Sequence, residues 1–273
     1  MIGLIFVLAF LVGLVVGSFL NVVILRGVRG ESIRGRSRCE ACRKTLGARE
    51  LIPILSYIMQ KARCRSCGSA LLWQYPLVEL GTGAAFAVTV WYLGFPADYL
   101  DISIFQYLGL ATALVAASAG IVILVADLRF QIIPNGAVLA LLIAGIGRLL
   151  LQAKLGTPAP SLAWNNLAAD IISALIAALF LASLWFFSRG RWMGLGDAKL
   201  IFATSLLVGF PASPVAILFA FWLGGVVGIF LFAAGRHTLK SRIPFGPFIL
   251  VGAVLAFFLS GPFLAFSGLD LLL

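Results

Sequence analysis

The chain has 273 residues, of which 62% are apolar and only 11% are charged. A soluble domain does not need so many long apolar runs, so the composition predicts a polytopic membrane protein. The formal net charge of +10 would suit nucleic-acid binding, but the basic residues gather in the loops between apolar runs. There they orient the protein and meet anionic lipid, so no nucleic-acid partner is expected.

Eight apolar runs approach or exceed the roughly 20 residues that a membrane-spanning helix needs. We expect an all-α membrane protein with helices at about 2–25, 74–94, 104–126, 133–151, 167–188, 198–211, 214–234 and 245–266. The first run lacks a preceding basic segment and a convincing small-residue cleavage site, so we interpret it as a retained helix. The predicted domains are the first helix at 1–25, a polar loop domain at 26–73 and a seven-helix membrane domain at 74–273.

The lysine and arginine residues predict the orientation of these helices. With eight spans, 18 of the 20 basic residues fall on one side, and only Arg148 and Lys154 fall on the other. The positive-inside rule makes the basic side cytoplasmic. The polar loop at 26–73 is therefore expected at the cytoplasmic face.

All four cysteines lie in this polar loop, as the pairs Cys39/Cys42 and Cys64/Cys67. The 21 residues between the pairs are one more than the usual zinc-ribbon spacing, in which four thiolates surround Zn²⁺ tetrahedrally. Disulfide bonds are the main alternative, which a reducing cytoplasm opposes, and iron in a rubredoxin-like site is another. Four thiolates fill the coordination shell, so we expect a structural zinc that holds together a loop too small for its own core.

Two aspartates stand where apolar runs meet polar segments. Asp127 follows the run at 104–126, and Asp197 ends a Gly-Leu-Gly-Asp sequence before the sixth run. Ionisable groups at membrane depth are costly and are usually retained for function. Two carboxylates on different helices suit an aspartyl-protease dyad, in which one holds a proton while the other activates water. Gly194 and Gly196 would let an extended substrate backbone approach Asp197.

Other interpretations of the acidic residues remain open. Asp127 would pair with Arg129 at the interface, and Asp197 would cap the N-terminus of a helix. A third possibility is that the two acids form a proton relay in a transporter. Glu79, about a turn or more inside the second run, would line a cavity. The sequence contains no HExxH, P-loop or GxGxxG pattern, so it does not indicate a zinc protease of that type or a nucleotide-type cofactor.

Several motifs, taken in order, resemble those of the type IV prepilin peptidases, membrane aspartyl proteases that process pilin and pseudopilin precursors. The resemblance covers nearly the whole chain. The motifs are residues 17–26, the two Cys-x-x-Cys pairs with residues 52–57 between them, residues 75–79, Asp127 with Ile133-Pro134, residues 193–200 and residues 243–248.

The resemblance implies cleavage of a prepilin or pseudopilin leader after a glycine at the cytoplasmic face of the bacterial inner membrane, with Asp127 and Asp197 catalytic. Because the cysteine loop is present, it also implies methylation of the new N-terminus with S-adenosylmethionine. Asn21, Arg26 and Glu79 are candidates for the methyl-transfer site. Alternatives are a presenilin-like protease, a proton-coupled transporter and a noncatalytic scaffold for pilus assembly. The absence of a Pro-Ala-Leu motif and the presence of the cysteine loop count against the first of these.

Overall fold

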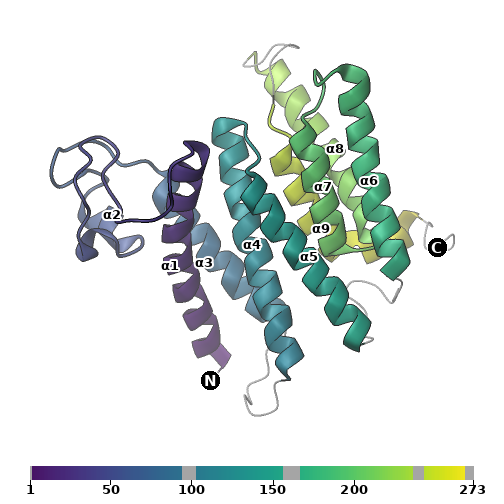
Figure 1. Ribbon diagram of the computed structural model, residues 1–273, viewed down its shortest axis with the longest axis horizontal. Helices are drawn as coiled ribbons and strands as arrows, with labels where there is room; N and C mark the ends of the chain where they lie inside the picture. The colour runs from purple at the N-terminus through teal and green to yellow at the C-terminus, as the bar shows by residue number, and fades with distance from the viewer. Residues whose placement is uncertain (1, 94–102, 156–166, 236–242, 268–273) are drawn as a thin grey trace. The chain divides into compact units, whose positions relative to one another are not determined.

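The computed structural model describes residues 2–93, 103–155, 167–235 and 243–267, and the regular secondary structure within them is helical (Figure 1). The elements are α1 (Ile2–Val28), the 3-10 helix η1 (Ala48–Glu50), α2 (Leu55–Met59), α3 (Gln74–Tyr92), α4 (Ile104–Phe130), α5 (Asn135–Leu155), α6 (Leu167–Ser188), α7 (Leu195–Val208), α8 (Ala212–Ala233) and α9 (Gly246–Ser267). Within the described residues, two isolated antiparallel β-bridges, Arg38 with Thr45 and Arg63 with Ala70, are the only strand-like pairings. The predicted all-α fold is confirmed.

Each of the eight predicted runs corresponds to a helix in the described ranges. Six of them, α1, α4, α5, α6, α8 and α9, are long and apolar enough to cross a membrane. The other two differ for separate reasons: α3 has 19 residues but includes polar side chains, and α7 has only 14 residues. The count of eight spans is therefore approximate. Three of the basic residues used for the orientation, Arg236, Lys240 and Arg242, lie outside the described residues.

The end of α4 differs from the expectation that Asp127 terminates its helix. The helix continues to Phe130, so Asp127 lies in its last turn. Gln131 closes that turn by donating its N–H to the Asp127 carbonyl at 2.9 Å, and its φ of +53° takes the backbone out of the helix. A left-handed residue directly after the last helical residue is a common way to stop a helix.

The chain divides into two compact units, Met1–Val125 and Ala126–Leu273. In the first unit, α1 and α3 pack closely through small residues. An added Cβ at Gly13 would lie 2.7 Å from Gly83 Cα, and one at Gly17 would lie 2.7 Å from Glu79 Cα. Small residues four positions apart are what allow helices in lipid to approach closely. The predicted division at residues 25 and 73 is not tested by these contacts and stays a prediction.

In the second unit, α7 lies among α5, α6, α8 and α9 (Figure 1). Most of its residues are buried, including Leu200, Ile201 and Leu206. A helix that is apolar on all sides is stable only when other helices surround it, which explains how so short a helix is held here. The first turn of this enclosed helix carries Asp197.

Candidate active site and metal centre

Asp127 is held by the first turn of α9. Its side chain is buried, and Oδ2 accepts the backbone N–H of Gly246 at 2.9 Å. The first N–H groups of a helix have no partner within the helix and attract negative charge, so this carboxylate satisfies α9 while α9 fixes the carboxylate. A Cβ at Gly246 would lie only 2.7 Å from Asp127 Oδ2, so the contact requires glycine.

Asp197 is held within its own helix turn. It is also buried, and its Oδ2 accepts the N–H of Gly194, the N-cap residue of α7, at 3.0 Å. The Asp197 N–H donates in return to the Gly194 carbonyl at 3.1 Å. The Asp197 carboxylate therefore supplies the N3 half of a capping box, and the N-cap glycine, which has no side chain, contributes its backbone carbonyl. The predicted capping role is therefore confirmed, but Asp197 occupies the third helical position and not the N-cap itself.

The two carboxylates interact electrostatically within the second unit. Leu200, one turn after Asp197, places its Cδ2 3.5 Å from where a Gly246 Cβ would stand, so the second turn of α7 adjoins the first turn of α9 beside Asp127. Two buried carboxylates of like charge cannot both ionise easily, which favours one shared proton. This arrangement can supply a base and an acid together. The Arg129 guanidinium lies 5.2 Å from the centre of the Phe130 ring, and its expected ion pair with Asp127 stays a prediction.

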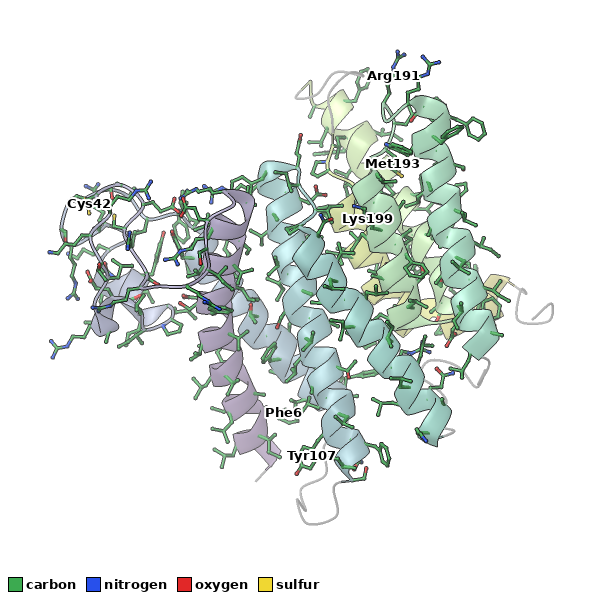
Figure 2. All side chains as sticks on the ribbon, in the orientation of Figure 1. Phe6, Cys42, Tyr107, Arg191, Met193 and Lys199 are labelled. Atoms are coloured by element: carbon green, nitrogen blue, oxygen red, sulfur yellow. The ribbon has the colours of Figure 1, made fainter. Side chains whose placement is uncertain are left out.

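The glycines beside Asp197 have a packing role. A Cβ at Gly196 would lie 3.3 Å from Ile133 Cβ, and one at Gly194 would lie 3.3 Å from Asp197 Oδ2. Both glycines therefore let the turn before α7 fit against the link after α4 and against the carboxylate. Figure 2 labels Met193 and Lys199, which bracket this turn. Access of a substrate backbone over the glycines stays a prediction.

The four cysteines of the first unit converge. Their Sγ atoms all lie within 4.8 Å of one another, and Cys39 Sγ is 3.9 Å from Cys67 Sγ. A tetrahedral Zn²⁺ with Zn–S bonds of about 2.3 Å holds its sulfur atoms about 3.8 Å apart. The donor set and its spacing therefore fit a metal ion of this kind. Figure 2 labels Cys42 in the loop that carries the first pair.

The two cysteine pairs have the same backbone geometry. Cys39 and Cys64 each donate their N–H to the carbonyl five residues on, at 2.9 Å, and each accepts the N–H four residues on, also at 2.9 Å. That fourth residue has a left-handed φ in both turns, +61° at Arg43 and +70° at Gly68. The Cys42 N–H, above all, lowers the pKa of the Cys39 thiol to about 6. The shared turn geometry thus brings the sulfur atoms of each pair to the same place.

Of the three candidates for methyl transfer, Arg26 and Glu79 hold the polar loop to α1 and α3, and Asn21 joins α1 to α3. The Asn21 amide donates to the Tyr75 carbonyl at 3.2 Å and accepts from Gln74 at 3.2 Å. Glu79 Oε2 accepts the Ile54 N–H at 2.7 Å, which holds a β-branched residue at a strained φ of +60°. The Arg26 guanidinium donates to the carbonyls of Ser32, Arg34 and Arg36.

Sequence reasoning missed two groups in the second unit. Gly246 contacts Asp127. Its only signal in the sequence is its position between Phe245 and a proline, in the motif at residues 243–248. Asp170 is buried in α6 and pairs with Arg148 of α5. An acid within an apolar run had singled out Glu79, and the same criterion applied to 167–188 would have found Asp170.

Comparison with known proteins places both sites in one family. Residues 11–93 match the bacterial peptidase A24 N-terminal domain, and residues 114–229 match the type IV leader peptidase family. The first range contains all four cysteines, and the second contains Asp127 and Asp197. No solved structure matches the chain significantly.

Curated relatives extend the match over most of the chain. A protein of Bacillus subtilis (strain 168) is 32% identical over 258 residues, covering 94% of this chain and 95% of its own. One of Burkholderia pseudomallei (strain 1026b) is 33% identical, with 95% and 87% covered. One of Aeromonas salmonicida (strain A449) is 30% identical, with 92% and 89% covered. All three are named prepilin leader peptidase/N-methyltransferase. The chain therefore belongs to the type IV leader peptidase family.

Proposed function

We propose that this membrane protein cleaves the leader of a type IV prepilin or pseudopilin after glycine and methylates the new N-terminus. Family membership makes it a protease, and the relatives' names carry both activities. We place the reaction at the cytoplasmic face of the bacterial inner membrane, because the basic loops and both aspartates fall on that side. Its substrates would be prepilins or pseudopilins whose apolar helix lies in the bilayer.

The observation that carries the peptidase proposal is the pair of buried, interacting carboxylates. Asp127 and Asp197 come from separate helices, and each is held through Oδ2 by one backbone N–H. One carboxylate would take a proton from water while the oxygen of that water attacks the scissile carbonyl carbon. The protonated partner would donate to the carbonyl oxygen, giving a tetrahedral intermediate. Collapse breaks the C–N bond as the leaving amine takes up a proton. The pair titrates as a unit, so neither residue is assigned the proton.

The first unit would support methylation. The four thiolates would hold a structural Zn²⁺, closing the loop at 26–73. S-adenosylmethionine would supply the methyl group. The groups of Asn21, Arg26 and Glu79 are engaged with the protein itself. We therefore assign them the shaping of the methyl-transfer region. Arg26 and Glu79 would do so by holding the loop on α1 and α3, and Asn21 by joining the two helices.

Intact-mass analysis of a prepilin incubated with the purified protein and S-adenosylmethionine tests both activities. Loss of the leader and a gain of one methyl group are expected. Asp127→Asn and Asp197→Asn should abolish cleavage with the fold intact, because asparagine keeps an oxygen that accepts the Gly246 or Gly194 N–H. Glu31→Gln, which removes an exposed loop carboxylate, is the matched control and should cleave normally. Cleavage by either folded asparagine variant would exclude the dyad.

The transporter hypothesis makes the opposite prediction. A proton relay through the same aspartates would give uptake or antiport in proteoliposomes and no new N-terminus on any precursor. The comparisons give no support to it, and family membership favours the peptidase.

A further inference from the structure

A buried ion pair holds the C-terminal end of α7. Arg148 of α5 places Nη1 and Nη2 each 3.2 Å from Asp170 Oδ2 of α6. Arg148 Nη1 also donates to the Leu206 carbonyl in the last turn of α7, at 2.9 Å. The Phe210 N–H, just beyond that turn, donates to Asp170 Oδ1 at 2.7 Å. The Asp170 side chain is 1% exposed and that of Arg148 17%. One guanidinium and one carboxylate therefore join the end of α7 to two neighbouring helices.

The glycine that ends α7 is shaped around this pair. Gly209 has a φ of +74°, and a Cβ there would overlap the Arg148 guanidinium, lying 2.8 Å from its Cζ. Its own N–H bonds the Ser205 carbonyl at 2.9 Å, and its carbonyl accepts the Ser213 N–H at 2.8 Å. The missing side chain at Gly209 thus leaves room for the guanidinium. We call Arg148, Asp170 and Gly209 together the α7 clamp.

The free energy of unfolding by itself is not a sufficient reason for an ion pair in the α7 clamp. A buried ion pair is often no more stabilising than apolar side chains of the same volume, so its distinct contribution is geometry. The 14 residues of α7 extend about 21 Å, against about 30 Å for the hydrocarbon of a bilayer. A helix of that length starting at one interface ends within the hydrocarbon, where open carbonyls are costly. A cation at the helix C-terminus, such as Arg148, supplies a hydrogen-bond donor to an open carbonyl and fixes where the helix stops.

The opposite end of the same helix carries Asp197. Leu206 follows Asp197 by nine residues, which is about 14 Å along a rigid helix. A shift or rotation of α7 at the α7 clamp therefore moves Asp197 relative to Asp127, which belongs to α4 and is held by the Gly246 N–H of α9. We propose that the α7 clamp sets the position of Asp197 against Asp127. This makes Arg148 and Asp170 positioning residues for leader cleavage, an inference that rests on the function proposed above.

Three variants disturb the α7 clamp in different ways. Arg148→Lys keeps the charge but loses the two-pronged contact, and Asp170→Asn keeps an acceptor but loses the charge. Gly209→Ala keeps both charged groups and pushes the guanidinium aside. Gln152→Leu is the matched control: it lies one turn further along α5, is buried, and its amide atoms have no hydrogen-bond partner in the described structure.

The measurements are kcat, KM and the pH–rate profile per folded molecule, together with hydrogen–deuterium exchange along α7. The three variants should lower kcat at least tenfold with KM within twofold and change the width of the pH–rate profile. They should also speed exchange at residues 194–198 as well as at 206–210. The exchange readout does not depend on activity. The Gln152→Leu control should match the wild type in kcat, KM, pH–rate profile and hydrogen–deuterium exchange.

Two outcomes would overturn the inference. One is faster exchange confined to 206–210 with wild-type kcat. The other is lower stability with an unchanged pH–rate profile and unchanged kcat per folded molecule, which would make the pair a structural brace only. A wild-type protein that cleaves no prepilin, while its variants still show coupled exchange at 194–198, would refute the proposed function and support the positioning role.

Discussion

Gly246→Ala tests the contact that holds Asp127. The added Cβ would lie 2.7 Å from Asp127 Oδ2, whereas ordinary contact begins at 3.4 Å, so the carboxylate or α9 must move by about 0.7 Å. Leu200 Cδ2 lies 3.5 Å from the same Cβ and limits the room for that movement. The movement lengthens the 2.9 Å hydrogen bond from the Gly246 N–H. Misplacing a reacting group by about 1 Å can cost about 100-fold in rate, so we expect kcat to fall about 10- to 100-fold.

Single-turnover cleavage of a prepilin, at matched amounts of folded protein, measures this effect. Gly252→Ala is the control for crowding: its Cβ would lie 2.6 Å from the Ala216 carbonyl oxygen, away from either aspartate. It should lower the free energy of unfolding by about 1–3 kcal/mol and leave kcat of the folded protein unchanged. Gly225→Ala has nothing within 4 Å and should be silent. A folded Gly246→Ala protein with wild-type kcat would refute this account of the site.

Four further outcomes follow from the structure. Asp197→Ala should unfold about 1 kcal/mol more easily than Asp197→Asn in thermal denaturation, because only asparagine still accepts the Gly194 N–H; equal stability would contradict the capping geometry. Arg43→Val should destabilise the loop by about 1–3 kcal/mol while Arg43→Gly does not, since φ is +61° there; limited proteolysis compares the two. Cys67→Ser should reduce bound zinc, measured by elemental analysis, from one equivalent per chain; undiminished zinc would exclude this ligand set. Gly17→Val should destabilise the α1–α3 pair by about 1–3 kcal/mol in detergent melts, because even a Cβ would lie 2.7 Å from Glu79 Cα; an unchanged melt would count against the close crossing.

Much of the candidate site could be read from local chemistry. The cysteine pairs needed only their spacing, because each Cys-x-x-Cys forms its turn from adjacent residues. The two aspartates stood out because charge is costly beside apolar runs. The capping role of Asp197 is likewise local, three residues from the Gly194 N–H that it accepts. The sequence placed Asp127 at a helix end but not in the last turn, because the left-handed φ of Gln131 leaves no clear sign in residue type.

Composition and spacing determined that this chain is a helical membrane protein with a cysteine-bound loop and two exceptional acids, since apolar runs and short-range motifs are properties of consecutive residues. Only the tertiary structure decided which groups from distant parts of the chain contact the two acids and the helix that carries Asp197. The Gly246 N–H reaches Asp127 from 119 positions away, and Arg148, Asp170 and Leu206 come from three separate helices. Such contacts depend on how helices pack, and packing is set by shape across the whole bundle and not by any local pattern.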